Sequence, residues 1–363
     1  MAIDIIGGNG RYGEFARAFD MHGRFNIGAT RPFFDEKTGR SYVSVYKGGD
    51  PNDKKSWSVV QSNASATLRR DEWKQLDQAL VTAARYRLGG IEDLVTRGLV
   101  FNVGNAMGTT VLEWHDISDG MNAVVTMDGI TRGPNDRPVY QYNYLPLPII
   151  HVDYEINARE LAASRSMGPS LDVTDAEQAA RRIYEQLETM LFTSYTYSYG
   201  TKDERNRNTI YGYLNFPDRN TVNLSINWDD SSITGPLIIQ DVIEMMQASI
   251  NDRHYGPWVL YIPTAYQTAL AYDFQAGYPK TILQRIKEIE GILDVKVIDT
   301  LTANNVLLVE MKPETVRLVR GLDLQNIQWG EEGNLVTKFK VMTIQVPQLR
   351  SDQNGRCGIV HLA

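Results

Sequence analysis

Residues 174–199 form the longest uninterrupted helical pattern in the chain, and this segment constrains how the other residues can fold. Thr174 and Glu177 have the spacing of a capping box, in which both side chains accept hydrogen bonds from backbone N–H groups at the helix start. One apolar stripe follows, at Ala176, Ala180, Ile183, Leu187, Met190 and Leu191. Roughly 25 helical residues span about 37 Å. The segment therefore predicts a rod that is long for a globular domain.

A compact motif follows this helical segment. Residues 210–217 read Ile-Tyr-Gly-Tyr-Leu-Asn-Phe-Pro, which has the form I-x-G-x-L-N-x-P. A long helix followed by this motif resembles the major capsid proteins of tailed double-stranded-DNA bacteriophages, which have the Hong-Kong-97 fold, and their cellular relatives, the encapsulins. We expect Gly212, Asn215 and Pro217 to form the turn after the long helix.

Two other stretches carry the same resemblance, which extends over residues 67–363. Residues 68–77, Leu-Arg-Arg-Asp-Glu-Trp-Lys-Gln-Leu-Asp, look like the first helix of encapsulins and of related phage capsid proteins. Residues 145–161, Leu-Pro-Leu-Pro-Ile-Ile-His-Val-Asp-Tyr-Glu-Ile-Asn-Ala-Arg-Glu-Leu, resemble encapsulins closely. The resemblance implies an α+β, Hong-Kong-97-like capsid fold with an N-terminal arm, an extended E-loop hairpin, a peripheral domain with a long spine helix, and an axial α/β domain.

The resemblance also implies a division of the chain into segments. They are an arm (1–66), the N-terminal helix region of the peripheral domain (67–108), the E-loop (109–145), the peripheral domain with its spine helix at 174–199 (146–235), the axial domain (236–325), and strands that return to the peripheral domain (326–363).

The arm has few periodic segments and many glycines. It predicts a short helix near Glu14 to Phe19 and a β-hairpin near Ser41 to Val60. Because such a segment cannot bury itself, we expect it to lie on neighbouring chains. Residues 8–13 satisfy G-x-G-x-x-G, but the preceding strand would have only about four residues, and no second strand ends in an acidic residue about 20 positions on. A flexible arm is favoured over a nucleotide site.

Residues 68–88 predict an amphipathic helix that Gly89 and Gly90 stop. Residues 109–144 then change to β segments, at the position of the family's E-loop, a two-stranded projection that lies over the adjacent subunit. A strand of 10 to 12 residues reaches roughly 35 to 40 Å. Because an isolated hairpin is marginally stable in water, the neighbour that it covers should stabilise it.

The E-loop carries the first set of expected assembly contacts, Trp114, Arg132, Asp136 and Arg137. The three charged residues at the tip would form ion pairs between subunits or be merely solvated. Some family members crosslink covalently through an E-loop lysine and an asparagine of another subunit. Residues 100–150 contain no lysine, so this crosslink cannot form here. The shell would depend on noncovalent contacts or on decoration proteins.

Residues 236–310 predict a compact α/β layer that looks like the axial domain. Helices are expected at 236–254, 263–272 and 279–290, and strands at 258–262, 295–299 and 306–310. Loop 274–280, with the expected contacts Phe274, Tyr278 and Lys280, or loop 301–305 would lie at a symmetry axis. The end of the chain is β-rich, with strands expected at 316–319, 327–329, 339–346 and 357–362.

Composition excludes several other classes of function. The net charge of −7 disfavours a protein that coats nucleic acid over its whole surface. The single cysteine, Cys357, leaves no intrachain disulfide and is expected to be buried in a strand. The five histidines have no helical metal-site spacing.

Tyr195, Tyr197 and Tyr199, followed by basic residues, suggest either nucleic-acid contact or a loop touching other subunits. Arg317, Arg320 and Asp323 read as an exposed ion pair rather than an active site.

No nucleophile elbow, Walker loop, kinase motif set or zinc helix is present, so we expect no enzyme and assign no catalytic, cofactor-binding or metal residue. The chain also lacks an apolar run of 18 residues and a signal-peptide pattern, which predicts synthesis in the host cytoplasm and no membrane contact.

The resemblance implies a major capsid protein that forms pentamers and hexamers of an icosahedral phage head around double-stranded DNA, which it would not read by sequence. The arm and the E-loop would lock this shell. Portal, scaffolding and decoration proteins would be partners, and the virion the final location. The alternative is an encapsulin-like compartment that encloses cargo enzymes.

Overall fold

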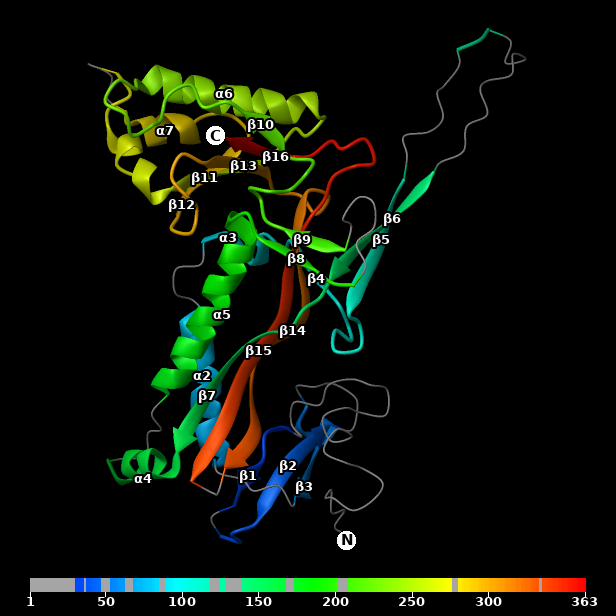
Figure 1. Cartoon of the computed structure of the whole chain (residues 1–363), viewed down its shortest axis with the longest axis vertical. Coiled ribbons are helices and arrows are strands. Elements are labelled where there is room, and N and C mark those ends of the chain that lie inside the picture. Colours follow the sequence, from blue (N-terminus) through cyan, green and yellow to red (C-terminus); the bar gives the residue numbers. More distant parts are fainter. Residues whose placement is uncertain are drawn as a thin grey trace.

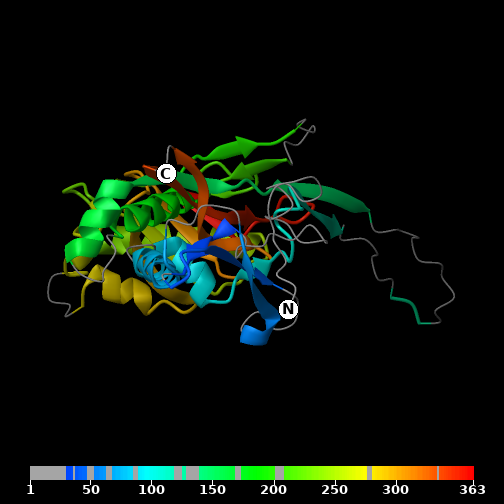
Figure 2. The ribbon, with the colours of Figure 1, turned by 90° about the horizontal axis from the view of Figure 1, so that it is seen from below.

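The computed structural model describes residues 30–35, 37–46, 53–62, 68–84, 89–117, 125–127, 139–167, 173–200, 208–275, 280–332 and 335–363. They form two bodies, one above the other in Figure 1. We call the lower one the spine body, after its long helix α5, and the upper one the sheet body, after its five-stranded sheet. A two-stranded hairpin projects from the side of the molecule in Figures 1 and 2.

The spine body is a four-stranded sheet with helices along one face. The strand order is β4-β14-β15-β7, and α5 packs on β7, β15 and α2. Its elements are α2 (Arg70–Ala84), β4 (Val100–Asn102), β7 (Ile150–Asn157), α4 (Ala158–Met167), α5 (Thr174–Phe192), β14 (Val316–Glu332) and β15 (Val336–Leu349).

The sheet body has the strand order β10-β16-β13-β11-β12 and carries α6 and α7. Its elements are β10 (Asn220–Val222), α6 (Gly235–Asn251), β11 (Trp258–Pro263), α7 (Ile282–Lys287), β12 (Ile292–Ile298), β13 (Val306–Glu310) and β16 (Ile359–Leu362). Three small sheets stand apart: β1 (Phe33–Phe34) with β2 (Ser41–Tyr46) and β3 (Trp57–Gln61), β5 (Val111–Ile117) with β6 (Tyr140–Pro146), and β8 (Thr196–Ser198) with β9 (Thr209–Tyr211).

One apolar core crosses from body to body. It joins Leu187 and Met190 of α5 to Val341 of β15 and to Val259 and Leu307 of the five-stranded sheet. The opposite face of that sheet packs against α6 and α7 in a second core, and a third core lies at the far end of α5. The two bodies therefore share one core, and each also has a core of its own.

The long helix is shorter than the sequence predicts. α5 ends at Phe192 instead of residue 199, because Thr193 is extended and Thr196–Ser198 pair with β9. The predicted capping box is also wrong: Val173 is the N-cap residue, and Thr174 is already helical. The backbone N–H of Glu177 donates to the carbonyl of Val173, at 3.0 Å, as an ordinary helical bond.

Gly89 and Gly90 begin a helix, α3 (Gly89–Thr96), whereas the sequence predicts that they stop one. A Cβ at Gly90 would meet the ring of Phe192, so glycine permits this close packing. Buried Glu188 of α5 accepts the backbone N–H of Gly90, at 2.9 Å, and that of Ile91, at 3.2 Å. The carboxylate thus caps α3 from another helix. Burial raises the pKa of Glu188 to about 7.

Helix α3 is also tied to the sheet body. Asp93 is buried and accepts a hydrogen bond from the hydroxyl of Tyr261, at 3.1 Å. The ammonium group of Lys296 lies 2.7 Å from the same carboxylate. Helix α3 therefore links α5 to β11 and β12.

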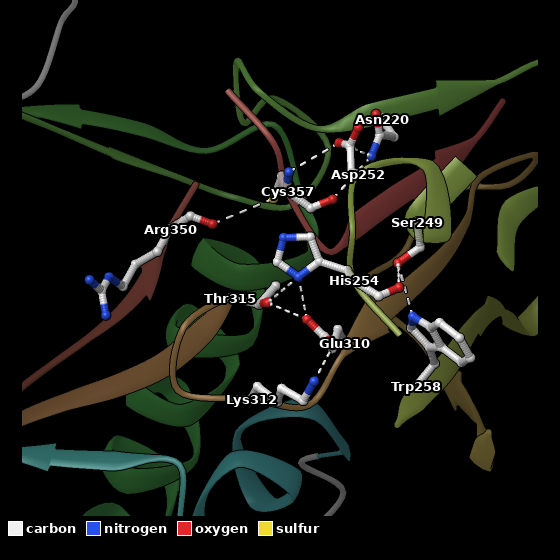
Figure 3. Close-up of polar contacts among 10 residues, drawn as sticks. All are labelled: Asn220, Ser249, Asp252, His254, Trp258, Glu310, Lys312, Thr315, Arg350 and Cys357. Atoms are coloured by element: carbon white, nitrogen blue, oxygen red, sulfur yellow. Dashed lines mark hydrogen bonds and ion pairs between the residues drawn. The ribbon is translucent and has the colours of Figure 1, made fainter. Parts of the chain in front are cut away.

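A second polar junction lies where the chain leaves β13 for β14 (Figure 3). Glu310 is 1% exposed and accepts hydrogen bonds from Lys312, at 2.9 Å, and Thr315, at 2.9 Å; His254, after α6, contacts the same carboxylate. Burial alone would raise the pKa of Glu310, but these hydrogen bonds hold it below its ordinary value. The junction ties α6 to the start of β14.

Asn215 holds the turn that follows α5. Asn215 donates to the carbonyl of Tyr195 and the hydroxyl of Thr196, both at 2.8 Å, and accepts the backbone N–H of Gly212 at 2.9 Å. A Cβ at Gly212 would lie within 3.0 Å of the carbonyl oxygens of Thr193 and Met190. Glycine is therefore required where the chain passes the end of the helix.

Other elements differ from the sequence predictions. Residues 264–266 and 269–271 form two short 3-10 turns in place of one helix, and residues 316–332 form one strand in place of two. The last strand, β16, pairs with β10 and β13 in the sheet body, whereas residues 326–363 were expected to return to the peripheral domain. Cys357 is buried as predicted, although it precedes β16.

We expect Gly212→Ala to destabilise the folded chain by about 2 to 3 kcal/mol, because the added methyl group overlaps two backbone carbonyls. Urea denaturation of Gly212→Ala and of the parent protein measures this difference in the free energy of unfolding. Gly104→Ala is the control, since a Cβ at Gly104 meets nothing within 4 Å. Equal midpoints for the two variants would contradict this account of the turn.

The raised pKa of Glu188 predicts a pH-dependent stability. Because the folded state holds this proton more tightly than the unfolded chain, the stabilisation is complete below the ordinary pKa of 4.5 and is lost as the pH rises through about 7. The shift corresponds to roughly 3 kcal/mol. Calorimetry at pH 5 and pH 8 should show a smaller stability change in Glu188→Gln than in the parent protein. Glu185→Gln, on the exposed side of α5, should keep the parent's pH dependence.

Candidate assembly surfaces

The hairpin β5–β6 is the largest projection among the described residues (Figures 1 and 2). Its strands pair from Val111 with Pro146 to Ile117 with Tyr140. On the outer face, the ring of His115 packs edge-on against Tyr140 and Tyr142, which are 54% and 56% exposed. An exposed aromatic face on a thin hairpin suits burial against another protein.

The inner face of the hairpin lines a cleft of about 390 Å³. Trp114, an expected assembly residue, contributes to its wall together with Phe216 and Pro217 of the turn after α5. The end of β15 and the segment 350–355 complete the wall. The structure therefore brings together two predicted residues, Trp114 and Pro217, that are 103 positions apart. Gly212 and Asn215 are not in the cleft lining, but they form the turn that carries Phe216 and Pro217.

The cleft has a mixed electrostatic character. Asp116 lies inside it, where burial raises the pKa of its carboxyl group against the opposing effect of Arg350, whose guanidinium lies 3.7 Å away. Asn143 also donates to Asp116. Asp218 and Asp352 lie at the exposed rim. Asp116 and Arg350 were not predicted from the sequence. They are 234 positions apart, and only the fold places the hairpin beside the end of β15.

Several predicted contacts lie outside the described residues, namely Arg132, Asp136, Arg137 and Tyr278. Two others are engaged within their own chain. Phe274 packs against the core of the sheet body, and the ammonium group of Lys280 pairs with Glu288. In the alternative axis loop, Leu301 is buried, while residues 302–304 are exposed.

The described root of the arm lies on its own chain, contrary to the expectation for residues 1–66. The guanidinium of Arg31 donates to both carboxylate oxygens of Asp77 in α2, at 3.0 and 2.9 Å. It also donates to the carbonyl of Asn326 in β14, at 2.7 Å, and stacks over the ring of Trp73, 5.3 Å from its centroid. Arg31 therefore fastens the arm to both layers of the spine body.

The next residues reinforce this attachment. The carbonyl of Pro32 accepts a hydrogen bond from the indole N–H of Trp73, at 3.1 Å. Phe33 and Phe34 lie under the guanidinium groups of Arg70 and Arg165, at 5.7 and 5.5 Å. Such cation–π contacts add to the ion pair. The sequence predicts the β2–β3 hairpin beyond this root, and the structure confirms it.

Two other charged or aromatic features have ordinary structural roles. Tyr195 and Tyr197 pack against the core that joins the two bodies, while Tyr199 is 51% exposed. Arg320 and Asp323 form an ion pair at 3.3 Å, as the sequence predicts. No helix in the described part of the chain is long and apolar enough to cross a membrane.

The arrangement of the two bodies is similar to that of solved shell proteins. The virus-like particle from Pyrococcus furiosus is 18% identical to the chain, with 80% of this chain and 99% of that chain covered and a TM-score of 0.56. The capsid of Myoviridae phage XM1 is 11% identical, with 75% and 91% covered and the same TM-score. These similarities confirm the expected fold: the chain has a Hong-Kong-97-like capsid fold.

Sequence comparison places the chain in a family but gives it no activity. No curated protein is significantly similar to it. Residues 63–362 match a family described only as of unknown function, DUF6260. Because the match spans more than four fifths of the residues, the chain belongs to the DUF6260 family.

Proposed function

We propose that the chain is the structural subunit of a closed protein shell, and specifically the major capsid protein of a tailed bacteriophage. The observation that carries this proposal is the projecting hairpin β5–β6 on a capsid fold. Its outer face exposes Tyr140 and Tyr142, and an isolated hairpin gains stability when a neighbour covers it. Copies that cover one another's hairpins form a repeating contact.

The geometry suits head-to-tail assembly. The hairpin leaves one side of the subunit, and the surface that receives it belongs to a different part of the next copy. Such heterologous contacts close into rings when the rotation between copies permits. We propose pentamers and hexamers of this kind, in which each subunit is held by several neighbours at once.

In this proposal, each expected domain corresponds to one part of the structure. The spine body corresponds to the peripheral domain, the sheet body to the axial domain, and the hairpin to the E-loop. Loops 274–280 or 301–305 of the sheet body would meet at the symmetry axes. The lack of lysine in residues 100–150 leaves the E-loop to noncovalent contacts. Portal, scaffolding and decoration proteins are the proposed partners of the shell in the phage.

A compartment that encloses proteins is the second candidate. It is favoured by the similarity to the Pyrococcus furiosus virus-like particle, almost all of which aligns with this chain. Both candidates use the same shell geometry, and they differ in contents: double-stranded DNA within a virion in one case, cargo enzymes in the other.

Electron microscopy of the purified chain, expressed alone, tests the shell itself: we expect closed icosahedral particles. A monomer or dimer at assembly concentrations would contradict the proposal. Particles isolated from the native source distinguish the two candidates, because a tail or packaged DNA supports the virion, whereas tail-less shells that hold an enzyme support the compartment.

Truncations separate the anchored root of the arm from the residues before it. Removal of residues 1–29 should leave the subunit's stability unchanged but weaken the shells, since Arg31 keeps its partners. Removal of residues 1–34 should lower the free energy of unfolding by about 3 kcal/mol, because Asp77 and Trp73 lose their contacts. Thermal unfolding of subunits and microscopy of particles measure the two effects. Equally heat-resistant shells after the first truncation would contradict an arm role in assembly.

A further inference from the structure

The cleft on the inner face of the hairpin carries a net negative charge. Among the described residues, its charged lining consists of three carboxylates and one guanidinium. Asp116 is paired with Arg350, and Asp352 with Arg356 outside the lining, each at 3.7 Å. Asp218 is exposed at the rim, and no ion pair joins it to any cation in the described part of the chain. The uncompensated carboxylate of Asp218 therefore favours a cationic ligand over an anionic one.

Aromatic side chains line the same cleft, namely those of Trp114, Tyr144, Tyr211 and Phe216. The rings of Tyr211 and Phe216 meet at a steep angle, with planes 72° apart and centroids 6.5 Å apart. The face of an aromatic ring attracts a cation, and proteins use several rings around one cavity to hold organic ammonium groups. The lining thus combines an unpaired negative charge with surfaces that suit an organic cation.

The rim that carries the carboxylates is held by its own hydrogen bonds. The carboxylate of Asp352 accepts the backbone N–H groups of Asn354 and Arg356, both at 2.8 Å. The hydroxyl of Ser351 donates to the carboxylate of Asp218, at 2.6 Å. Because these bonds form within the chain itself, the rim is ordered before a ligand enters, and binding costs little conformational entropy there.

The size of the cleft favours a small organic ligand over a metal ion. A volume of about 390 Å³ lies in the range of small-molecule pockets. Across the described residues, no group of three or more histidine, cysteine, aspartate or glutamate side chains could hold a metal ion. An alkyl chain with an ammonium group at each end has the matching chemistry. Its methylene groups can pack on aromatic rings while its ends meet the carboxylates of the rim.

We propose that this cleft binds an aliphatic polyamine. One ammonium group pairs with Asp218, and the methylene chain packs between Tyr211 and Phe216. A second ammonium group lies at the rim beside Asp352, whose side chain is 41% exposed. The inference goes beyond the proposed function, because it adds a small-molecule ligand to a structural subunit.

Equilibrium dialysis of the full chain against ¹⁴C-labelled spermidine, at about 150 mM salt to screen nonspecific attraction, tests the site. We expect saturable binding of one spermidine per chain. Asp218→Asn keeps an oxygen that can accept from Ser351 but removes the charge, and it should weaken binding about fivefold, the upper end for an exposed ion pair. Asp323→Asn, which removes an exposed carboxylate outside the cleft lining, is the matched control and should bind like the parent.

A second pair of variants tests the aromatic wall. Tyr211→Phe keeps the ring and should bind spermidine like the parent, whereas Tyr211→Leu should bind it more weakly. Thermal unfolding without ligand verifies that each variant is folded. Equal affinities for Tyr211→Leu and Tyr211→Phe would contradict packing of the ligand on this ring.

Three further results would overturn the proposal: binding that does not saturate, equal affinities for Asp218→Asn and the parent, or loss of binding when Mg²⁺ supplies the same concentration of charge. Spermidine bound by unassembled chains but not by shells would show that a neighbouring chain fills the cleft in the particle, which also overturns it. Dialysis measures the chain whether or not shells form, so failure of this inference is distinct from failure of the proposed function.

Discussion

The packing of Phe192 at the end of the spine helix positions both bodies of the subunit. Its buried ring meets Tyr261 of the five-stranded sheet and Tyr213 of the following turn edge-on, with centroids 4.9 and 5.4 Å away. Gly90 leaves room for the ring, and Glu188, one turn earlier, caps the helix that Gly90 begins. Aromatic rings in such T-shaped contacts have a preferred orientation as well as an apolar area. This packing fixes the end of α5 against the five-stranded sheet, together with the shared core and the polar junctions at Asp93 and Glu310.

Elements with strong local signals could be predicted from the sequence. Three examples have patterns that lie within a few consecutive residues: the apolar stripe of α5, the strand Val306–Glu310, and the turn at Gly212 and Asn215. Elements that depend on distant partners could not. The glycine pair at 89 and 90 is a stop signal locally, whereas the distant carboxylate of Glu188 caps a helix that starts there and the ring of Phe192 requires a glycine at residue 90. Strand β14 appeared as two pieces because register shifts near Leu322 break its alternation.

The candidate site was predictable only in part for the same reason. The hairpin and its lack of lysine are local features of the sequence. They allowed Trp114 to be predicted as an assembly contact. The cleft needs the turn after α5 and the end of β15, which the fold brings to the inner face of the hairpin. Likewise, the arm root was expected on a neighbour because the partner of Arg31 in β14 is 295 positions away. Long-range ion pairs leave no spacing pattern that a sequence can reveal.

The paired strands β14 and β15 extend from the shared core at Val316 to the distal core at Phe339, with one antiparallel ladder along their length. Tension applied along this axis loads the rungs of the ladder together, as shear, rather than peeling them one after another. Pressure from inside a container stretches its wall in the plane of the wall. In the proposed shell, subunits placed with this ladder in the wall would resist bursting with many hydrogen bonds at once. The register shifts near Leu322 and Gly330 interrupt the ladder.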